Sequence, residues 1–163
     1  MDARQVITTS GKLALYVMSS YLEDLSQEEL FLRPGGKANH IAWQLGHLIV
    51  SENSILNTIK PGSVAELPKG FAEAHSGEAT EVDDPSKFSK KEEYLELLNV
   101  QRNALVKLVG ELSDDELQQP APESIRSIVP TVADALLMMA NHTLMHSGQI
   151  AVLRRTLGKP III

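Results

Sequence analysis

The chain of 163 residues contains no cysteine. This absence excludes disulfide bonds, thiolate nucleophiles, iron–sulfur clusters and zinc sites built on cysteine, so a metal ion would have to be held by His, Asp or Glu. The chain also lacks an apolar run long enough to span a bilayer, and Met1 is followed by Asp2 and Arg4 rather than by a signal peptide. We therefore expect a cytoplasmic protein that does not enter membranes.

Positive charge is scarce as well. Fifteen Lys and Arg residues stand against twenty-one Asp and Glu residues, which gives a net charge of −6. Without a basic stripe to neutralise phosphates, the chain is not expected to bind nucleic acid or an anionic membrane surface. Apolar residues make up 43 % of the chain, enough for a full core, and the length predicts one domain over residues 1–163.

Apolar residues recur at steps of three and four in four segments, and no segment has the alternation of a strand. The predicted helices cover about residues 3–24, 39–59, 89–111 and 131–157. The third helix is expected to begin at a capping box of Ser89 and Glu92. The fourth is expected to begin at Thr131, after Pro130, and to end before Gly158.

The connections indicate how these helices are joined. Residues 25–30 and 112–117 are similar to each other, and each forms a short capped turn between two predicted helices. Residues 60–88 are rich in Pro, Gly, Ser and acidic residues and have no helical period, which predicts one long connection. The sequence therefore predicts an all-α four-helix bundle with a long crossover between its second and third helices.

Two of the five histidines, His142 and His146, are four residues apart in the last predicted helix. That spacing places both rings on one helix face, where they can converge on a divalent ion. They interrupt a run of inward positions, namely Ala135, Met139, Ile150, Leu153 and Leu157. The residues alone leave two interpretations open, a metal site or two core histidines with separate hydrogen-bond partners. The glutamate of an H-E-x-x-H motif is missing, which excludes the zincin protease mechanism.

A third ligand has to come from another helix, and His47 in the second helix is the candidate. Gly46 beside it lowers helix stability by about 1 kcal/mol, which is tolerated where a neighbouring helix or a ligand approaches closely. His40 either lines a pocket or caps its helix, and we expect it to line the pocket. His75, in the long connection, is expected to be solvated.

Two segments carry a family resemblance, Asn39-His40-Ile41-Ala42-Trp43-Gln44-Leu45-Gly46-His47-Leu48 and His142-Thr143-Leu144-Met145-His146-Ser147-Gly148-Gln149-Ile150. With the helix order, the crossover and the two short turns, they resemble the DinB/YfiT-like metalloenzyme superfamily over essentially the whole chain. The resemblance implies that one divalent metal is bound by His47, His142 and His146, with water completing the shell. Characterised relatives include transferases and isomerases that use bacillithiol or mycothiol, and others are classed as hydrolases.

Three neutral imidazoles suit zinc, nickel, iron or copper, and zinc is the first choice, with nickel or iron as alternatives. An open position on such an ion supports either hydrolysis or the activation of an external low-molecular-weight thiol, and the sequence leaves both open.

Trp43 and Gln149 are expected to line the pocket together with His40. Asp134 and Glu52 are not expected to act as a base at the histidines, because helical geometry turns Glu52 away and Asp134 belongs to a first helical turn.

The predicted function is a metal-dependent enzyme, a transferase or hydrolase, that acts on a small molecule. The alternative is a non-catalytic bundle that binds a metal or a partner in a structural or stress-related role. A homodimer is also expected, because wide apolar stripes and the segment Ile161-Ile162-Ile163 need to be covered.

Overall fold

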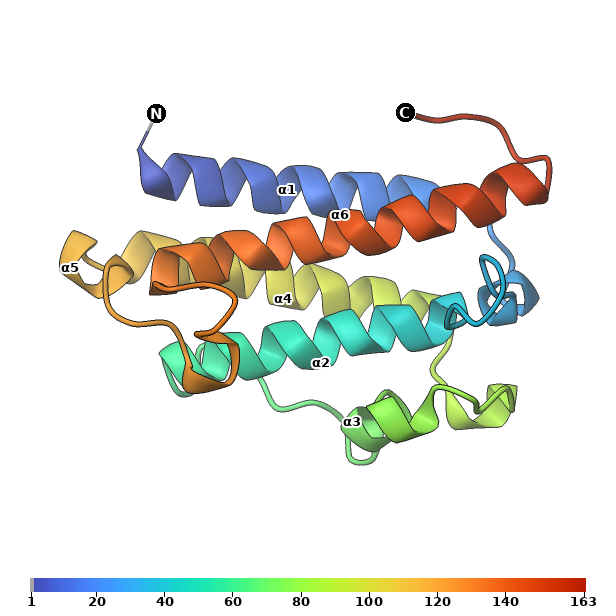
Figure 1. The fold of residues 1–163 in the computed structure, drawn as a ribbon, viewed down its shortest axis with the longest axis horizontal. Helices are drawn as coiled ribbons and strands as arrows, with labels where there is room; N and C mark the ends of the chain where they lie inside the picture. The colour runs from blue at the N-terminus through green and yellow to red at the C-terminus, as the bar shows by residue number, and fades with distance from the viewer. Residues whose placement is uncertain (1) are drawn as a thin grey trace.

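The computed structural model describes residues 2–163, and these residues form helices, turns and one isolated β-bridge between Pro120 and Thr131. Four helices are long: α1 (Ala3–Leu22), α2 (Ile41–Ile59), α4 (Lys91–Glu111) and α6 (Val132–Thr156) (Figure 1). The others are single turns: η1 (Glu28–Phe31), α3 (Phe71–Ala74), η2 (Gly77–Ala79), η3 (Pro85–Lys87), α5 (Asp114–Leu117) and η4 (Glu123–Ile125). Among residues 2–163, no helix combines the length and the apolar character that a membrane span requires.

The ends of the long helices follow local capping. Thr131 is the N-cap of α6 as predicted, and its hydroxyl accepts a hydrogen bond from the Asp134 N–H. The predicted start of α4 is wrong by one residue. The Glu93 carboxylate accepts from the N–H of Lys90, which is the N-cap, whereas the Ser89 N–H donates to the Tyr94 hydroxyl.

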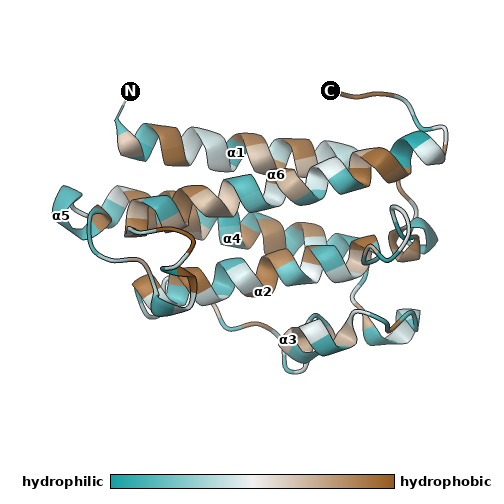
Figure 2. Ribbon diagram, in the orientation of Figure 1, coloured by the Kyte–Doolittle hydropathy of each residue, from teal (hydrophilic) through white to brown (hydrophobic). Residues whose placement is uncertain are grey.

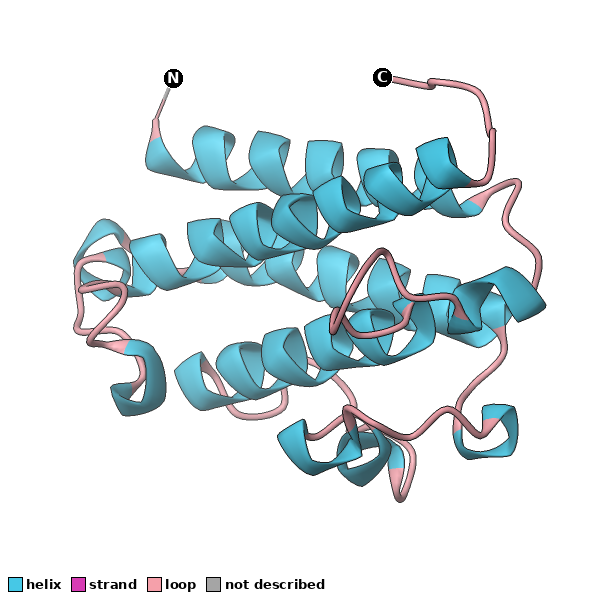
Figure 3. Ribbon diagram, turned by 45° about the vertical axis from the view of Figure 1, so that its right-hand side comes forward, coloured by secondary structure: helices cyan, strands magenta, loops and turns pink. Residues whose placement is uncertain are grey.

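Each long helix packs against two others, so that α1 and α2 both contact α4 and α6 (Figures 1 and 3). In Figure 1, α2 and α4 run in the same direction, opposite to α1 and α6. The chain must therefore return along the length of the helices between α2 and α4, which is the physical reason for the predicted long crossover. This segment contains α3, η2 and η3, and α3 packs against α2.

The core consists of two apolar clusters with a polar layer between them. The polar layer consists of three almost completely buried residues, Glu52 on α2, Arg102 on α4 and Thr143 on α6. Arg102 Nη2 lies 2.9 Å from Glu52 Oε1, and the Thr143 hydroxyl donates to the same oxygen at 3.1 Å. Breaking such a buried pair costs about 3–5 kcal/mol, because it leaves an uncompensated charge. The polar layer therefore links α2, α4 and α6 at the same height along the bundle.

His75 holds the crossover against α2, and the prediction that it is solvated is wrong. Its side chain is buried, and its Nδ1–H donates to the Phe71 carbonyl at 2.7 Å. Its Nε2 accepts from the Tyr94 hydroxyl, also at 2.7 Å. A Cβ on Gly46 would lie 1.9 Å from the His75 ring. The close approach that makes glycine suitable at this position therefore comes from the crossover segment.

We expect Gly46→Ala to lower the free energy of unfolding by about 1–3 kcal/mol, because the added methyl group overlaps the His75 ring. In a His75→Ala background the same substitution should cost much less, since the ring is gone. Urea denaturation of the four proteins in this cycle measures the difference. The matched control is Gly110→Ala on α4, where a Cβ meets no atom of residues 2–163 within 4 Å. An equal cost of Gly46→Ala in both backgrounds would contradict this account.

Candidate metal centre

The structure brings His47, His142 and His146 together between α2 and α6. One ring nitrogen of each residue lies within 4.8 Å of those of the other two. The Nε2 atoms of His142 and His146 are 3.2 Å apart, and the His47 ring centroid lies 5.1 Å and 5.7 Å from the His142 and His146 centroids. The spacing of four residues aligns the pair on α6, and the packing of α2 against α6 adds the third ring.

The three imidazoles are held in their neutral form. Burial lowers the pKa of His142 and of His146 to about 4, and the neighbouring histidines add to the shift. Burial also lowers the pKa of His47. A proton therefore does not compete for the ring nitrogens near pH 7, and their lone pairs are free to bind a cation.

Gln44 orients His146. The Gln44 Nε2 donates to the Asn39 carbonyl at 2.6 Å, which directs Oε1 toward His146 Nδ1 at 2.8 Å. Nδ1 must carry the proton in this contact, so the lone pair of His146 Nε2 faces the cluster. Sequence reasoning missed Gln44. The available signal was a polar residue one turn before His47 within the apolar stripe of Ile41, Leu45 and Leu48.

Trp43 orients His47 and connects it to the crossover. The two rings are stacked, with centroids 4.9 Å apart and an interplanar angle of 8°. The Trp43 Nε1–H donates to the Ser76 carbonyl at 3.0 Å. The indole is therefore fixed between a loop carbonyl and an imidazole, and the position of His47 depends on the crossover segment.

His40 was predicted to line the pocket, with helix capping as the alternative, and the structure shows the capping arrangement. His40 is the N-cap of α2, where its Nδ1 accepts from the Trp43 N–H at 3.1 Å. Its Nε2–H donates to the Val82 carbonyl at 2.9 Å. Both ring nitrogens are therefore used to hold α2 and the crossover. Gln149 is half-buried three residues after His146, and its role in a pocket stays a prediction.

The two acids considered from the sequence have structural partners. Glu52 belongs to the polar layer with Arg102 and Thr143. The Asp134 carboxylate accepts from the Thr131 hydroxyl at 2.6 Å, at the start of α6. Neither carboxylate is therefore placed to serve the histidine cluster as a general base.

Two of the three histidines in the cluster are partly exposed. His146 is buried, whereas His47 and His142 are half-buried. Within residues 2–163, three His, Asp, Glu or Cys ligands contribute to the cluster. Three protein ligands are typical of a metal site that keeps one coordination position open, whereas a structural site is closed by four.

Comparison with known proteins gives one family. The family model DinB_2, described as the DinB superfamily, matches residues 12–150, a range that includes all three clustered histidines. A comparison with curated proteins gives no match.

The lowered histidine pKa values predict a pH-dependent stability of the metal-free protein. In the unfolded chain these histidines titrate near 6.5, whereas the folded pKa of His142 and His146 is about 4. Between these values the unfolded state binds more protons, so the free energy of unfolding should fall as the pH decreases from about 6.5 to about 4. Urea denaturation at about pH 7.5 and about pH 5 measures this change.

The control for this pH dependence is the double variant His142→Gln, His146→Gln. It should show a shallower fall, with a remainder from His40, His47 and His75, whose pKa values burial also lowers. A fall as steep as that of the parent protein would contradict the assignment.

Proposed function

The chain belongs to the DinB superfamily, and from this membership and the histidine geometry we propose that it is a metal-dependent enzyme acting on a small molecule. His47, His142 and His146 would hold one divalent ion. The observation that carries the proposal is the convergence of three neutral imidazoles, one of which has its second nitrogen already bonded to Gln44.

The donor set fits a borderline metal ion. Imidazole nitrogens suit zinc, nickel, iron and copper, whereas magnesium and calcium prefer oxygen ligands. Zinc is the first choice, because it accepts three protein nitrogens with one further ligand in a tetrahedral shell. The Gln44 contact supports metal binding by His146, since histidine ligands of metals almost always donate their other N–H to an oxygen acceptor.

The number of candidate ligands, three rather than four, favours catalysis over a purely structural role. A fourth coordination position that no protein group fills can accept a water molecule or a substrate. An ion in such a site acts as a Lewis acid and lowers the pKa of a ligand that can lose a proton. A closed four-ligand shell would instead favour the alternative of a non-catalytic bundle.

Thiol-dependent transfer is the reaction class that we favour. A free thiol has a pKa of about 8.5 and water one of about 15.7, so a thiol needs a much smaller shift to ionise near pH 7. The chain has no cysteine, so the thiol would come from a low-molecular-weight cosubstrate. Glu52 and Asp134, the two acids considered as general bases, are hydrogen-bonded to Arg102 and Thr131 instead. A cosubstrate that ionises easily, such as a thiol, suits a site to which neither acid contributes a base.

The untagged protein should bind about one equivalent of zinc or nickel, because it offers one cluster of three ligands. Trp43, the sole tryptophan, stacks on His47, so titration with Ni²⁺ should quench its fluorescence. Elemental analysis and fluorescence titration measure the two effects. The double variant His142→Ala, His146→Ala should bind no metal at this site and show no saturable quenching.

The metal-loaded protein is then assayed with a low-molecular-weight thiol and chlorodinitrobenzene, and separately with an ester substrate. Thiol conjugation that depends on the metal and on the histidine pair would support the favoured reaction, and ester cleavage alone would assign a hydrolase. Stoichiometric metal binding without either activity would favour the non-catalytic alternative. Failure to bind zinc or nickel after reconstitution would contradict the whole proposal.

Gln44→Leu should weaken metal binding by about 10–100-fold, the usual effect of removing the acceptor of a ligand imidazole. The variant leaves His146 Nδ1–H without its partner, so the ring loses its fixed orientation. Competition with a chromogenic chelator measures the dissociation constant. Gln101→Leu is the matched control, since it removes the same group from a buried position on α4 and should change the constant by less than about threefold. Equal effects of the two substitutions would argue against the role of Gln44.

A further inference from the structure

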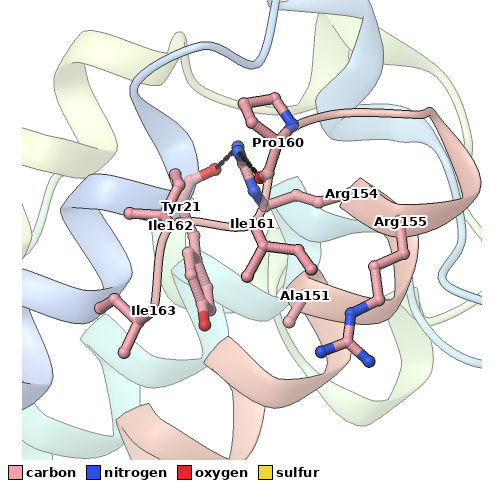
Figure 4. Close-up of a pocket in the computed structure, with 8 residues that line it drawn as sticks. All are labelled: Tyr21, Ala151, Arg154, Arg155, Pro160, Ile161, Ile162 and Ile163. Atoms are coloured by element: carbon pink, nitrogen blue, oxygen red, sulfur yellow. Dashed lines mark hydrogen bonds between the residues drawn. The ribbon is translucent and has the colours of Figure 1, made fainter.

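The crossover segment contains a cavity outside the metal centre. This crossover cavity has a volume of about 260 Å³ and is formed by α3, η3 and the first turn of α4, with Phe71, His75 and Phe88 among its lining residues. The segment lies beside α2 on the outside of the bundle, and most of its residues are hydrophilic (Figures 1 and 2). By contrast, the cavity between Tyr21 and residues 161–163 measures about 20 Å³, which is room for one water molecule (Figure 4). Sites for drug-sized ligands start at about 300 Å³, so the crossover cavity suits a smaller molecule with one ring.

Three aromatic rings line the crossover cavity together. The His75 ring centroid lies 4.4 Å from that of Phe71 and 5.5 Å from that of Phe88. Both ring nitrogens of His75 are already hydrogen-bonded, Nδ1 to the Phe71 carbonyl and Nε2 to the Tyr94 hydroxyl. The three rings therefore offer a ligand their faces and edges rather than a free polar atom. Such a lining favours contact with another aromatic ring.

The charge around the crossover cavity is positive, in contrast to the chain as a whole. Lys69 and Lys87 line it, and neither ammonium group has an acid of residues 2–163 within 4.0 Å. Of the same residues, Glu93 is the acid that lines the cavity, and its carboxylate is used to cap α4. The nearby Asp84 carboxylate accepts from the N–H and the hydroxyl of Ser86. Two cations without acidic partners, in a chain of net charge −6, favour an anion here.

A small aromatic carboxylic acid combines the two features that this lining recognises. Its ring would pack against Phe71, His75 and Phe88, while its carboxylate, ionised near pH 7, would face Lys69 and Lys87. A neutral ring would leave the lysines unused, and a small inorganic anion would leave the rings unused. Single exposed charges contribute little, so the rings would supply most of the affinity and the lysines the preference for an acid.

His75 connects the crossover cavity to the metal centre. Its ring lines the cavity and also fills the space of a Cβ on Gly46, the residue before His47. The carbonyl of the next residue, Ser76, accepts from Trp43 Nε1–H at 3.0 Å, and Trp43 stacks on His47. A ligand in the cavity would hold the crossover segment against α2. Through these contacts it would also restrict the motion of the His47 ring.

We propose that the crossover cavity is an effector site for a small aromatic carboxylate, whose binding orders the crossover segment and tightens metal binding at the histidine cluster. The coupling rests on the proposed metal centre, whereas the binding of the acid does not. By linkage, a metal bound at the cluster raises the affinity for the acid by the same factor. Failure of metal binding and failure of the effector site are therefore separate outcomes.

Isothermal titration calorimetry of the metal-free chain with benzoate tests the site. Benzoate should bind with a dissociation constant of about 1 mM or below. Neutral benzamide and non-aromatic cyclohexanecarboxylate should each bind at least about threefold more weakly. The double variant Lys69→Met, Lys87→Met should raise the benzoate constant about fivefold. The matched control Lys12→Met, Lys107→Met removes two exposed charges outside the cavity and should leave it unchanged. No saturable binding of benzoate, or equal binding of benzoate and benzamide, would overturn the proposal.

Chelator competition then measures the zinc dissociation constant with and without benzoate, at a benzoate concentration equal to its own dissociation constant in the parent protein. The zinc constant should fall about threefold in the parent protein and less than about twofold in the double lysine variant. Equal falls in both would indicate direct ligation of zinc by benzoate and overturn the proposal, as would an unchanged constant in the parent protein.

Trp43→Phe tests the route of the coupling. It keeps an aromatic ring beside His47 but removes the Nε1–H that donates to Ser76, so benzoate should still bind and no longer change the zinc constant. If the chain binds no zinc, a change in Trp43 fluorescence on adding benzoate reports the same coupling. An unchanged fluorescence in that case would equally overturn the proposal.

Discussion

The contact between His75 and Gly46 links the crossover segment to the histidine cluster. α2 and α4 run in the same direction, so a long segment has to return along the helices, and here it packs against α2. The His75 ring occupies the space of a Cβ on Gly46, and the Ser76 carbonyl beside it holds Trp43. Because Trp43 stacks on His47, the position of the His47 ring depends on a loop that is distant in sequence.

The five histidines of the chain have partly or fully buried side chains. The hydrogen bonds of their ring nitrogens separate them into two groups. His40 and His75 use both ring nitrogens in hydrogen bonds to carbonyl, hydroxyl or N–H groups and therefore stabilise the fold. His146 uses one nitrogen in this way and directs the other toward His142. The Nε2 atoms of His142 and His146 face each other and are not used by a carbonyl, hydroxyl or amide group, so they are the nitrogens that could hold a cation.

The four long helices and the histidine pair on α6 could be predicted because they depend on local information. Apolar spacing gave the helices, Thr131 marked the start of α6, and a separation of four residues aligned His142 with His146. The start of α4 was misplaced because Ser89 and Lys90 both precede acids at the right spacing. The choice between them depends on Tyr94, whose hydroxyl accepts from the Ser89 N–H.

The sequence by itself determined the helical class, the exclusion of cysteine chemistry and, through the family resemblance, the three candidate ligands. Only the tertiary structure decided that His75 is buried, that His40 bonds to the Val82 carbonyl and that Gln44 orients His146. The physical reason is that these roles depend on contacts between segments that are 29 to 102 residues apart, as for Gly46 with His75 and Gln44 with His146. Helical periodicity reports which face of a helix is apolar, but it carries no information about which loop or side chain will lie against that face.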